Sequence, residues 1–177
     1  MIEAAWAGFV DLRRAPQRVA EIAEAAAFPP LAELLLALNA DDSPVWTAKC
    51  DFWEAEDVES TGIVPESAAD SCLQALACYV DVLPAEERVF AQWHQAEALC
   101  RDWVARLNAV AAPRCRINLV VRQALVGEAE GFAVTAYIAG AGGDRAHATE
   151  ALAAAMAAFS EVIPGGATPA HDASQIQ

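Results

Sequence analysis

Residues 115–140, CRINLVVRQALVGEAEGFAVTAYIAG, decide the fold class of this chain. They contain two runs in which apolar and polar residues alternate, and this period of two is typical of β-strands with one buried face. Glycines and acidic residues separate the two runs. The pattern therefore predicts strands over 115–126 and 132–140, joined as an antiparallel hairpin by a loop of about five residues.

A third alternating run lies upstream, at residues 45–54, VWTAKCDFWE. The rest of the chain has apolar residues at helical spacing, interrupted by prolines and glycines that end helices. The expected helices are a pair within residues 15–40, one that starts at Ser67 with Leu73, Leu76, Ala77 and Val80 on its apolar face, a long one over 85–111 and a last one over 145–162.

These elements predict an α+β fold with a small, mostly antiparallel sheet of about three strands. Their order is β-α-α-β-β-α, close to a split β-α-β layout, with helices on one face and an N-terminal helical pair. We expect residues 1–166 to form one domain, with the helical pair at 15–40 and the sheet at 45–163, and residues 167–177 to be a disordered tail. The large side chains expected in one core are Trp46, Phe52, Trp93, Trp103, Leu119 and Val134.

The composition excludes several classes of protein. The chain has 177 residues, 56% of them hydrophobic, and no apolar run reaches the roughly 20 residues needed to span a membrane. The net charge is −14 and Lys49 is the only lysine among 11 basic residues, whereas nucleic-acid binding requires clustered cations. We expect a bacterial cytoplasmic protein without nucleic-acid or membrane partners, whose five cysteines are reduced and not catalytic.

Neither a metal site nor a cofactor site can be assembled from the sequence. His94 with Glu97, and His147 with Glu150, offer histidine and carboxylate three residues apart, but no further ligands arrive at matching positions. The glycines after the last strand are an incomplete dinucleotide motif, because no parallel strand follows the next helix. We therefore predict no cofactor, no metal ion and no catalytic set of residues.

The two faces of the predicted sheet differ in chemistry. Alternation places Trp46, Ala48, Cys50 and Phe52, with the apolar residues of the hairpin, towards the helices. The opposite side, which we call the polar face, is expected to carry Thr47, Lys49, Asp51, Trp53, Arg116, Asn118, Val120, Arg122, Thr135 and Tyr137.

The polar face supplies the candidate binding residues: Lys49, Asp51, Trp53, Arg116, Asn118, Arg122, Thr135 and Tyr137. Its cations stand out in an acidic chain, and arginine forms paired hydrogen bonds with carboxylates and phosphates. We predict a non-catalytic binding or protein-interaction domain that holds an anionic small molecule or a partner protein, or self-associates as a homodimer.

Other interpretations remain open. One is a small enzyme acting on an anionic substrate, with Lys49 and Asp51 as reacting groups and Arg116 and Arg122 as clamps. Another is an acidic chaperone or adaptor for a basic partner. The polar face can also be a solvated surface without a ligand, or be covered by the N-terminal helices.

Overall fold

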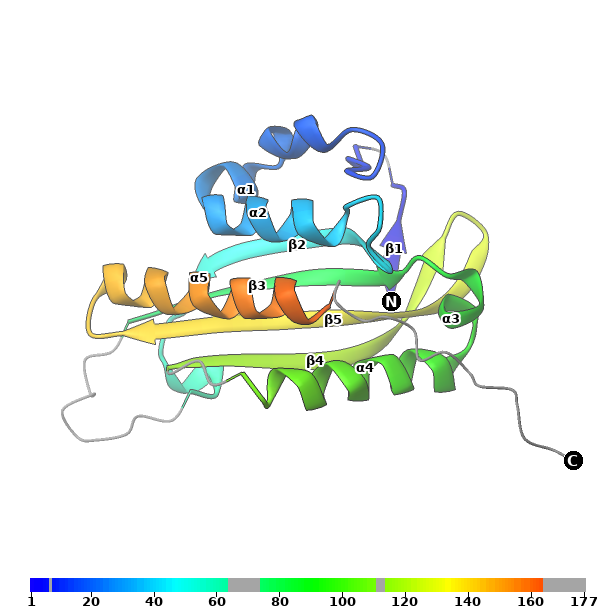
Figure 1. Cartoon of the computed structure of the whole chain (residues 1–177). Coiled ribbons are helices and arrows are strands. Elements are labelled where there is room, and N and C mark those ends of the chain that lie inside the picture. The colour runs from blue at the N-terminus through cyan, green and yellow to red at the C-terminus, as the bar shows by residue number, and fades with distance from the viewer. Residues whose placement is uncertain (7, 64–73, 111–113, 164–177) are drawn as a thin grey trace, which may run out of the picture.

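The computed structural model describes residues 1–6, 8–63, 74–110 and 114–163 (Figure 1). The predicted disordered tail, 167–177, lies outside the described residues. The elements along the chain are β1 (Ile2–Ala4), the 3-10 helix η1 (Pro16–Glu21), α1 (Ala23–Ala27), α2 (Pro29–Leu38), β2 (Val45–Glu54), the 3-10 helix η2 (Glu59–Thr61), β3 (Gln74–Pro84), α3 (Glu87–Ala91), α4 (Trp93–Leu107), β4 (Cys115–Val126), β5 (Ala129–Gly142) and α5 (Arg145–Val162).

The chain is α+β, but the prediction of about three antiparallel strands is wrong. The described residues form a five-stranded mixed sheet in the order β1-β4-β5-β3-β2. β1 is parallel to β4, and the other neighbours are antiparallel. β1 and β3 were the strands missing from the prediction, so the expected split β-α-β order is wrong as well.

β3 was expected to be a helix because Leu76, Ala77 and Val80 recur at helical spacing. The strand lies between β2 and β5, and residues on both of its faces are buried. A strand that is buried on both faces does not show the apolar–polar alternation by which a strand with one solvent-exposed face is recognised. A short, continuous apolar run of this kind fits either a strand or a buried helix.

The sheet is nearly closed at one end. The β4–β5 hairpin curves towards β1, and the two edge strands β1 and β2 lie beside each other there (Figure 1). All five strands contribute to one small apolar cluster at this end, which α3 completes with Phe90. The strands surround this cluster, so the face that carries it is the inner, concave side of the curled sheet.

The opposite face holds the main core. It packs against α2, α4 and α5, with Trp103 and Phe159 fully buried and their rings edge to face at 6.4 Å. α5 approaches β5 so closely that a Cβ atom at Gly140 or Gly142 would collide with the helix at Leu152 or His147. Gly140 and Gly142 therefore serve helix–strand packing.

The connections differ from the prediction in two places. The long helix expected over 85–111 is interrupted at Gln92, which has an extended backbone, so α3 turns away and places Phe90 against Gly131 of the hairpin. The loop of the hairpin is shorter than expected, because pairing continues to Val126 and Ala129. Gly127 adopts a positive φ of 61° in this tight turn, a conformation that glycine adopts without strain.

The expectation of one shared core for six large side chains is only partly met. Trp103 and Val134 are fully buried in the main core, and Phe52 and Leu119 pack against it half-buried. Trp46 is buried on the other face, in the cluster at the closed end. Trp93 is 48% exposed and touches Phe132 of β5, near the β4–β5 turn.

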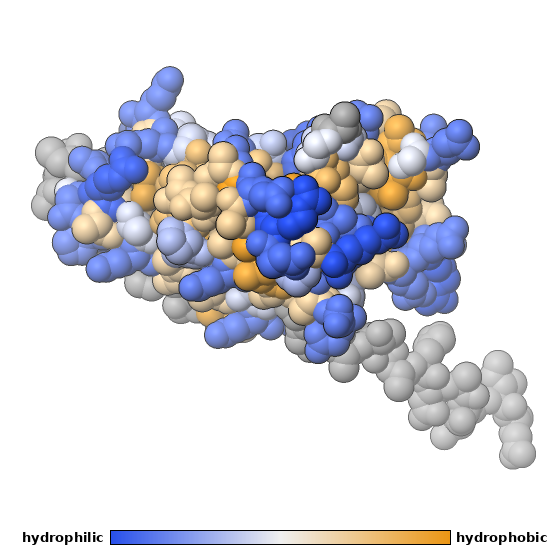
Figure 2. Space-filling model, turned by 90° about the horizontal axis from the view of Figure 1, so that it is seen from above, coloured by the Kyte–Doolittle hydropathy of each residue, from blue (hydrophilic) through white to orange (hydrophobic). Residues whose placement is uncertain are grey.

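The N-terminal segment covers the β2 side of the molecule. The predicted helical pair is present as α1 and α2, which Phe28 separates, and η1 precedes them. Only α2 has more than two turns. From above, hydrophilic and hydrophobic side chains intermix on its surface (Figure 2). Some of its charges pair locally: Arg13 donates to Asp11, and Arg18 donates to Glu21. None of the helices in the described ranges has the length and apolar character to cross a membrane.

Candidate functional site

A β-bulge in β2 changes which side chains reach the polar face. Thr47 pairs with Val82 and Cys50 pairs with Val80, so Ala48 and Lys49 together oppose the single residue Asp81. A bulge of this type resets the alternation of the strand. The predicted faces of Trp46, Thr47 and Ala48 are therefore wrong, whereas Lys49, Asp51 and Trp53 lie on the polar face as expected.

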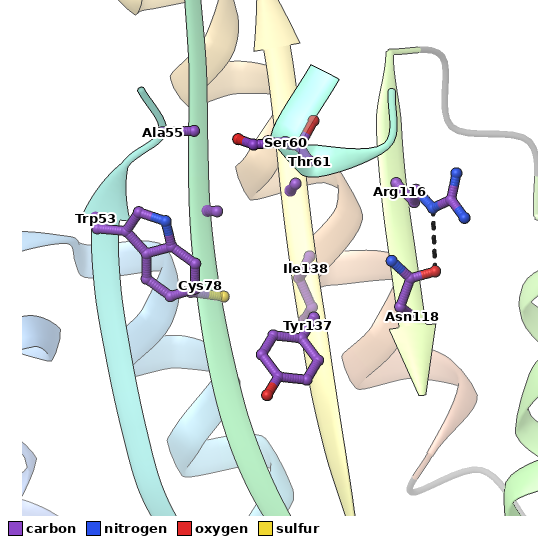
Figure 3. A pocket seen from close by; sticks show the side chains of 11 residues that line it. Trp53, Ala55, Ser60, Thr61, Cys78, Arg116, Asn118, Tyr137 and Ile138 are labelled. Carbon is purple, nitrogen blue, oxygen red and sulfur yellow. Dashed lines mark hydrogen bonds between the residues drawn. The ribbon is translucent and has the colours of Figure 1, made fainter. Parts of the chain in front are cut away.

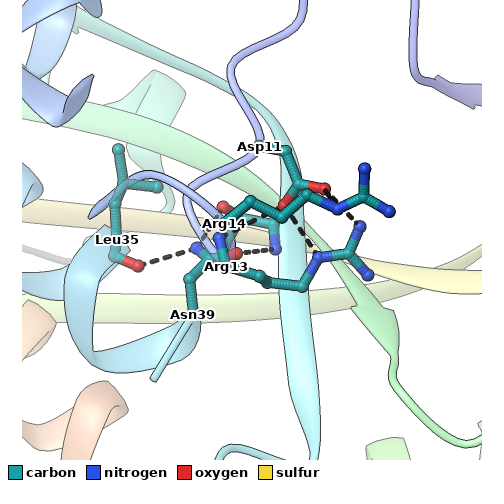
Figure 4. Close-up of polar contacts among 6 residues, drawn as sticks. Asp11, Arg13, Arg14, Leu35 and Asn39 are labelled. Carbon is teal, nitrogen blue, oxygen red and sulfur yellow. Dashed lines mark hydrogen bonds and ion pairs between the residues drawn. The ribbon is translucent and has the colours of Figure 1, made fainter. Parts of the chain in front are cut away.

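Thr47 is held on the helix side of the sheet by Asn39. The Asn39 amide donates to the Thr47 hydroxyl at 2.6 Å and to the Leu35 carbonyl at 2.7 Å, and its oxygen accepts from the Thr47 backbone at 3.1 Å (Figure 4). Both side chains are buried. These bonds anchor β2 to the end of α2 immediately before the bulge.

The centre of the polar face contains a buried carboxyl group, Asp81 of β3. Its side chain accepts a 2.6 Å hydrogen bond from Thr135 of β5, and both residues are buried. Burial raises the pKa of Asp81 above its ordinary value, although the Thr135 hydrogen bond and the charges of Arg122 and Lys49 act in the opposite direction. A perturbed carboxyl group flanked by cations on a concave face is typical of functional sites.

Arg122 and Lys49 are the two cationic side chains that act on the charge of Asp81. The Arg122 guanidinium donates to the Tyr137 hydroxyl at 2.8 Å, and its Nε atom is buried without a hydrogen-bond partner. The Lys49 ammonium lies 4.8 Å from the centre of the Trp6 ring. Neither cation forms an ion pair with a carboxylate among the described residues. Buried polar groups usually have a partner, so the unpaired Nε marks Arg122 as a side chain whose hydrogen-bonding capacity the described residues do not fill.

Three aromatic side chains lie beside these charges, and we call them the aromatic row: Trp53 of β2, Tyr79 of β3 and Tyr137 of β5. The ring centres are 6.4 Å apart for Trp53 and Tyr79, and 6.1 Å apart for Tyr79 and Tyr137. Burial, together with the nearby Asp81 and Asp51, raises the pKa of Tyr79, so its hydroxyl stays protonated and can donate.

A small open pocket of about 160 Å³ lies at one end of the aromatic row, between η2 and the sheet (Figure 3). Trp53, Tyr137, Asn118 and Arg116 contribute to its lining. Arg116 donates to the Gly62 carbonyl at 2.6 Å and to Asn118 at 3.0 Å. Its guanidinium therefore fixes the loop after η2 onto the sheet and is already engaged.

The eight predicted residues share the polar face but do not form one cluster. Lys49 and Arg122 lie near Asp81, with Thr135 bonded to it. Arg116 and Asn118 lie further along β4 at the pocket, and the exposed Asp51 accepts only from the adjacent backbone of Phe52 among the described residues. Tyr137 and Trp53 belong to the aromatic row.

Sequence reasoning missed Asp81 and Tyr79 because β3 was expected to be a helix. One signal was present: Asp81 is the only charged residue in the apolar run 75–83, ALACYVDVL. A single carboxyl group in a buried run has a high energetic cost, and such a residue marks a candidate site.

Other chemistry receives less support from the described residues. They contain no group of three or more His, Cys, Asp or Glu side chains suited to a metal ion. His147 bonds to Asp144 at the start of α5, and Glu97 pairs with Arg101. Burial raises the pKa of Cys50 to about 12, which keeps this thiol protonated and unreactive.

The polar face thus combines an unpaired guanidinium nitrogen, a second cation, a buried carboxyl group and an aromatic row on a concave surface. Comparisons of this chain with protein-family models, with curated proteins and with solved structures found no match.

Proposed function

We propose that this protein is a binding domain that holds a small anionic ligand on its polar face, with Arg122 as the main anchor. The observation that carries the proposal is the buried Arg122 Nε atom, which has no partner among the described residues. A carboxylate placed against the accessible part of this half-buried guanidinium would receive a charge-assisted hydrogen bond, among the strongest in proteins.

The surroundings of Arg122 support the same role. The Tyr137 hydroxyl fixes one nitrogen of the guanidinium, so less side-chain entropy is lost on binding. Lys49 adds a second positive charge that no described carboxylate neutralises by an ion pair. In a chain of net charge −14, these two cations make the polar face locally attractive to an anion.

The test is a titration of the protein with small carboxylates, followed by calorimetry. Arg122→Ala should weaken binding by about 1.5 to 3 kcal/mol, or roughly 10- to 100-fold, because a charged hydrogen bond is lost. Arg101→Ala is a matched control, since Arg101 is an exposed arginine of α4 that pairs with Glu97. Equal binding by both variants would overturn the proposal.

A second candidate function, an enzyme that acts on an anionic molecule, is favoured by Asp81. The raised pKa of Asp81 suits a group that transfers protons. The sequence had suggested Asp51 for this role, but Asp51 is exposed. Turnover of a bound anion that is lost in Asp81→Asn while binding persists would favour the enzyme. Self-association and an acidic chaperone or adaptor role stay predictions, and no described contact favours either.

A further inference from the structure

The aromatic row has features that sheet packing alone does not require. Trp53 is 38% exposed, and it does not belong to the apolar cluster that closes this end of the polar face. Tyr79 and Tyr137 are half-buried beside it, with centre-to-centre distances in the range of favourable ring contacts. The row therefore presents ring surface to the space above the sheet.

The space beside the row has the size of a single ring. Trp53 and Tyr137 both line the pocket, and both project from the same side of the sheet (Figure 3). Its volume of about 160 Å³ is close to that of a cavity of ~150 Å³ that is known to accommodate benzene. A drug-sized ligand would need roughly 300 Å³ or more.

The row and the unpaired guanidinium meet at Tyr137. Its ring lines the pocket, and its hydroxyl accepts the hydrogen bond from Arg122. Arg122 does not line the pocket, so a ligand reaches it with its ring against Tyr137 and its charged group at the hydroxyl end of that ring. Tyr79 lies between the other two members of the row across the sheet, because β3 lies between β2 and β5. Its hydroxyl has no hydrogen bond to a described residue.

The charge of the ligand is limited by Asp81. This carboxyl group lies close enough to Arg122 and Lys49 to interact with both. A ligand with two negative charges would be repelled more strongly by Asp81 than a single carboxylate, which the Arg122 charge can balance. The site therefore favours a monocarboxylate over a phosphate.

We infer that the ligand of the polar face is a small aromatic carboxylate, with its carboxylate on Arg122 and its ring on the aromatic row beside the pocket. This assignment deepens the proposed function and depends on it. It adds a ring requirement to the requirement for an anion.

Calorimetric titrations with benzoate, cyclohexanecarboxylate, acetate and inorganic phosphate test the assignment. Benzoate should bind about 3- to 10-fold more tightly than cyclohexanecarboxylate, because only the flat ring makes favourable contacts with tryptophan and tyrosine rings. Acetate and phosphate should bind more weakly than benzoate. Trp53→Ala should weaken benzoate binding about 3- to 10-fold and leave acetate binding unchanged.

Two further variants control for folding and for the loss of any tryptophan. Trp93→Ala removes an exposed tryptophan of α4 that does not line the pocket, and it should bind benzoate like the wild type. Trp53→Phe keeps a ring and should retain most of the affinity, whereas Trp53→Leu should not. Circular dichroism of each variant shows whether the fold is retained. If Trp53→Ala does not fold, the comparison of Trp53→Phe with Trp53→Leu tests the ring requirement instead.

The outcomes separate the two proposals. If cyclohexanecarboxylate binds as tightly as benzoate, or if Trp53→Leu equals Trp53→Phe, the ring requirement is wrong and the anion site survives. Tighter binding of phosphate than of benzoate would also overturn the assignment. If no carboxylate binds the wild type, the proposed function fails together with the ligand class.

Discussion

The two faces of the sheet have opposite relations to stability. The helix-covered face contains fully buried apolar side chains, such as Trp103 and Phe159, and approaches α5 so closely that β5 needs glycine. The polar face carries a buried carboxyl group, an unpaired guanidinium nitrogen and exposed ring surface. The helix-covered face stabilises the fold. The polar face has apolar clusters at its two ends, and between them it carries polar groups whose energetic cost ligand binding can offset.

The largest effect is expected on the helix-covered face. Trp103→Ala should lower the free energy of unfolding by about 3 to 5 kcal/mol, because a large ring that is 1% exposed is lost from the main core. Chemical denaturation measures this change. Trp93→Ala, at a side chain that is 48% exposed, is the control and should cost far less. Equal losses in the two variants would remove the distinction between core and edge.

An intermediate effect on the free energy of unfolding is expected at the bulge in β2, where the alternation of side chains between the two faces is interrupted. Asn39→Ala should lower the free energy of unfolding by about 1 to 3 kcal/mol, because the backbone and hydroxyl of Thr47 lose their partner inside the protein. The measurement is thermal or chemical unfolding. Asp11→Ala, at a local surface pair with Arg13, should cost less than about 1 kcal/mol. A loss as small at Asn39 would contradict its role as an anchor.

The smallest effect is expected on the polar face, and its sign is opposite. The raised pKa of Asp81 means that the folded state holds the proton more tightly than the unfolded state, so stability falls as pH rises through the folded pKa. Asp81→Asn removes this cost and can still accept from Thr135. The variant should be more stable than the wild type at neutral pH, with the difference fading below about pH 4.

Melting temperatures of both proteins across this pH range test the Asp81 prediction. A variant that is less stable at neutral pH would show that attraction to Arg122 and Lys49 outweighs burial. The comparison of the two faces would then need revision, because the polar face would itself contribute to stability.

Strands with one solvent-exposed face could be predicted from the sequence, and strands without such a face could not. Alternation identified β2, β4 and most of β5, and α5 was expected at the residues where it occurs. β3 has two covered faces and therefore no alternation. β1 has only three residues, too few for any period, and its pairing with β4 depends on tertiary structure.

The candidate site was predictable as a face but not as a cluster. The alternation of side chains along each strand predicted that Arg122, Tyr137 and Trp53 lie on the same face of the sheet, and in the structure they do. The bulge in β2 cannot be detected from the alternation of apolar and polar residues. Thr47 and Trp46 were therefore assigned to the wrong faces of the sheet. Asp81 was missed because its strand was taken for a helix, although it is the only charged residue in the apolar run 75–83.

The three residues of β1 have a consequence for self-association of the chain. By pairing with Ala124, Leu125 and Val126, β1 covers the backbone of β4 at the closed end of the sheet. Uncovered strand edges are templates for pairing with other molecules and lead to aggregation. A chain deprived of this short strand would expose the backbone edge of β4 and would lose Ile2 and Ala4 from the apolar cluster at the closed end, so we expect it to aggregate more readily.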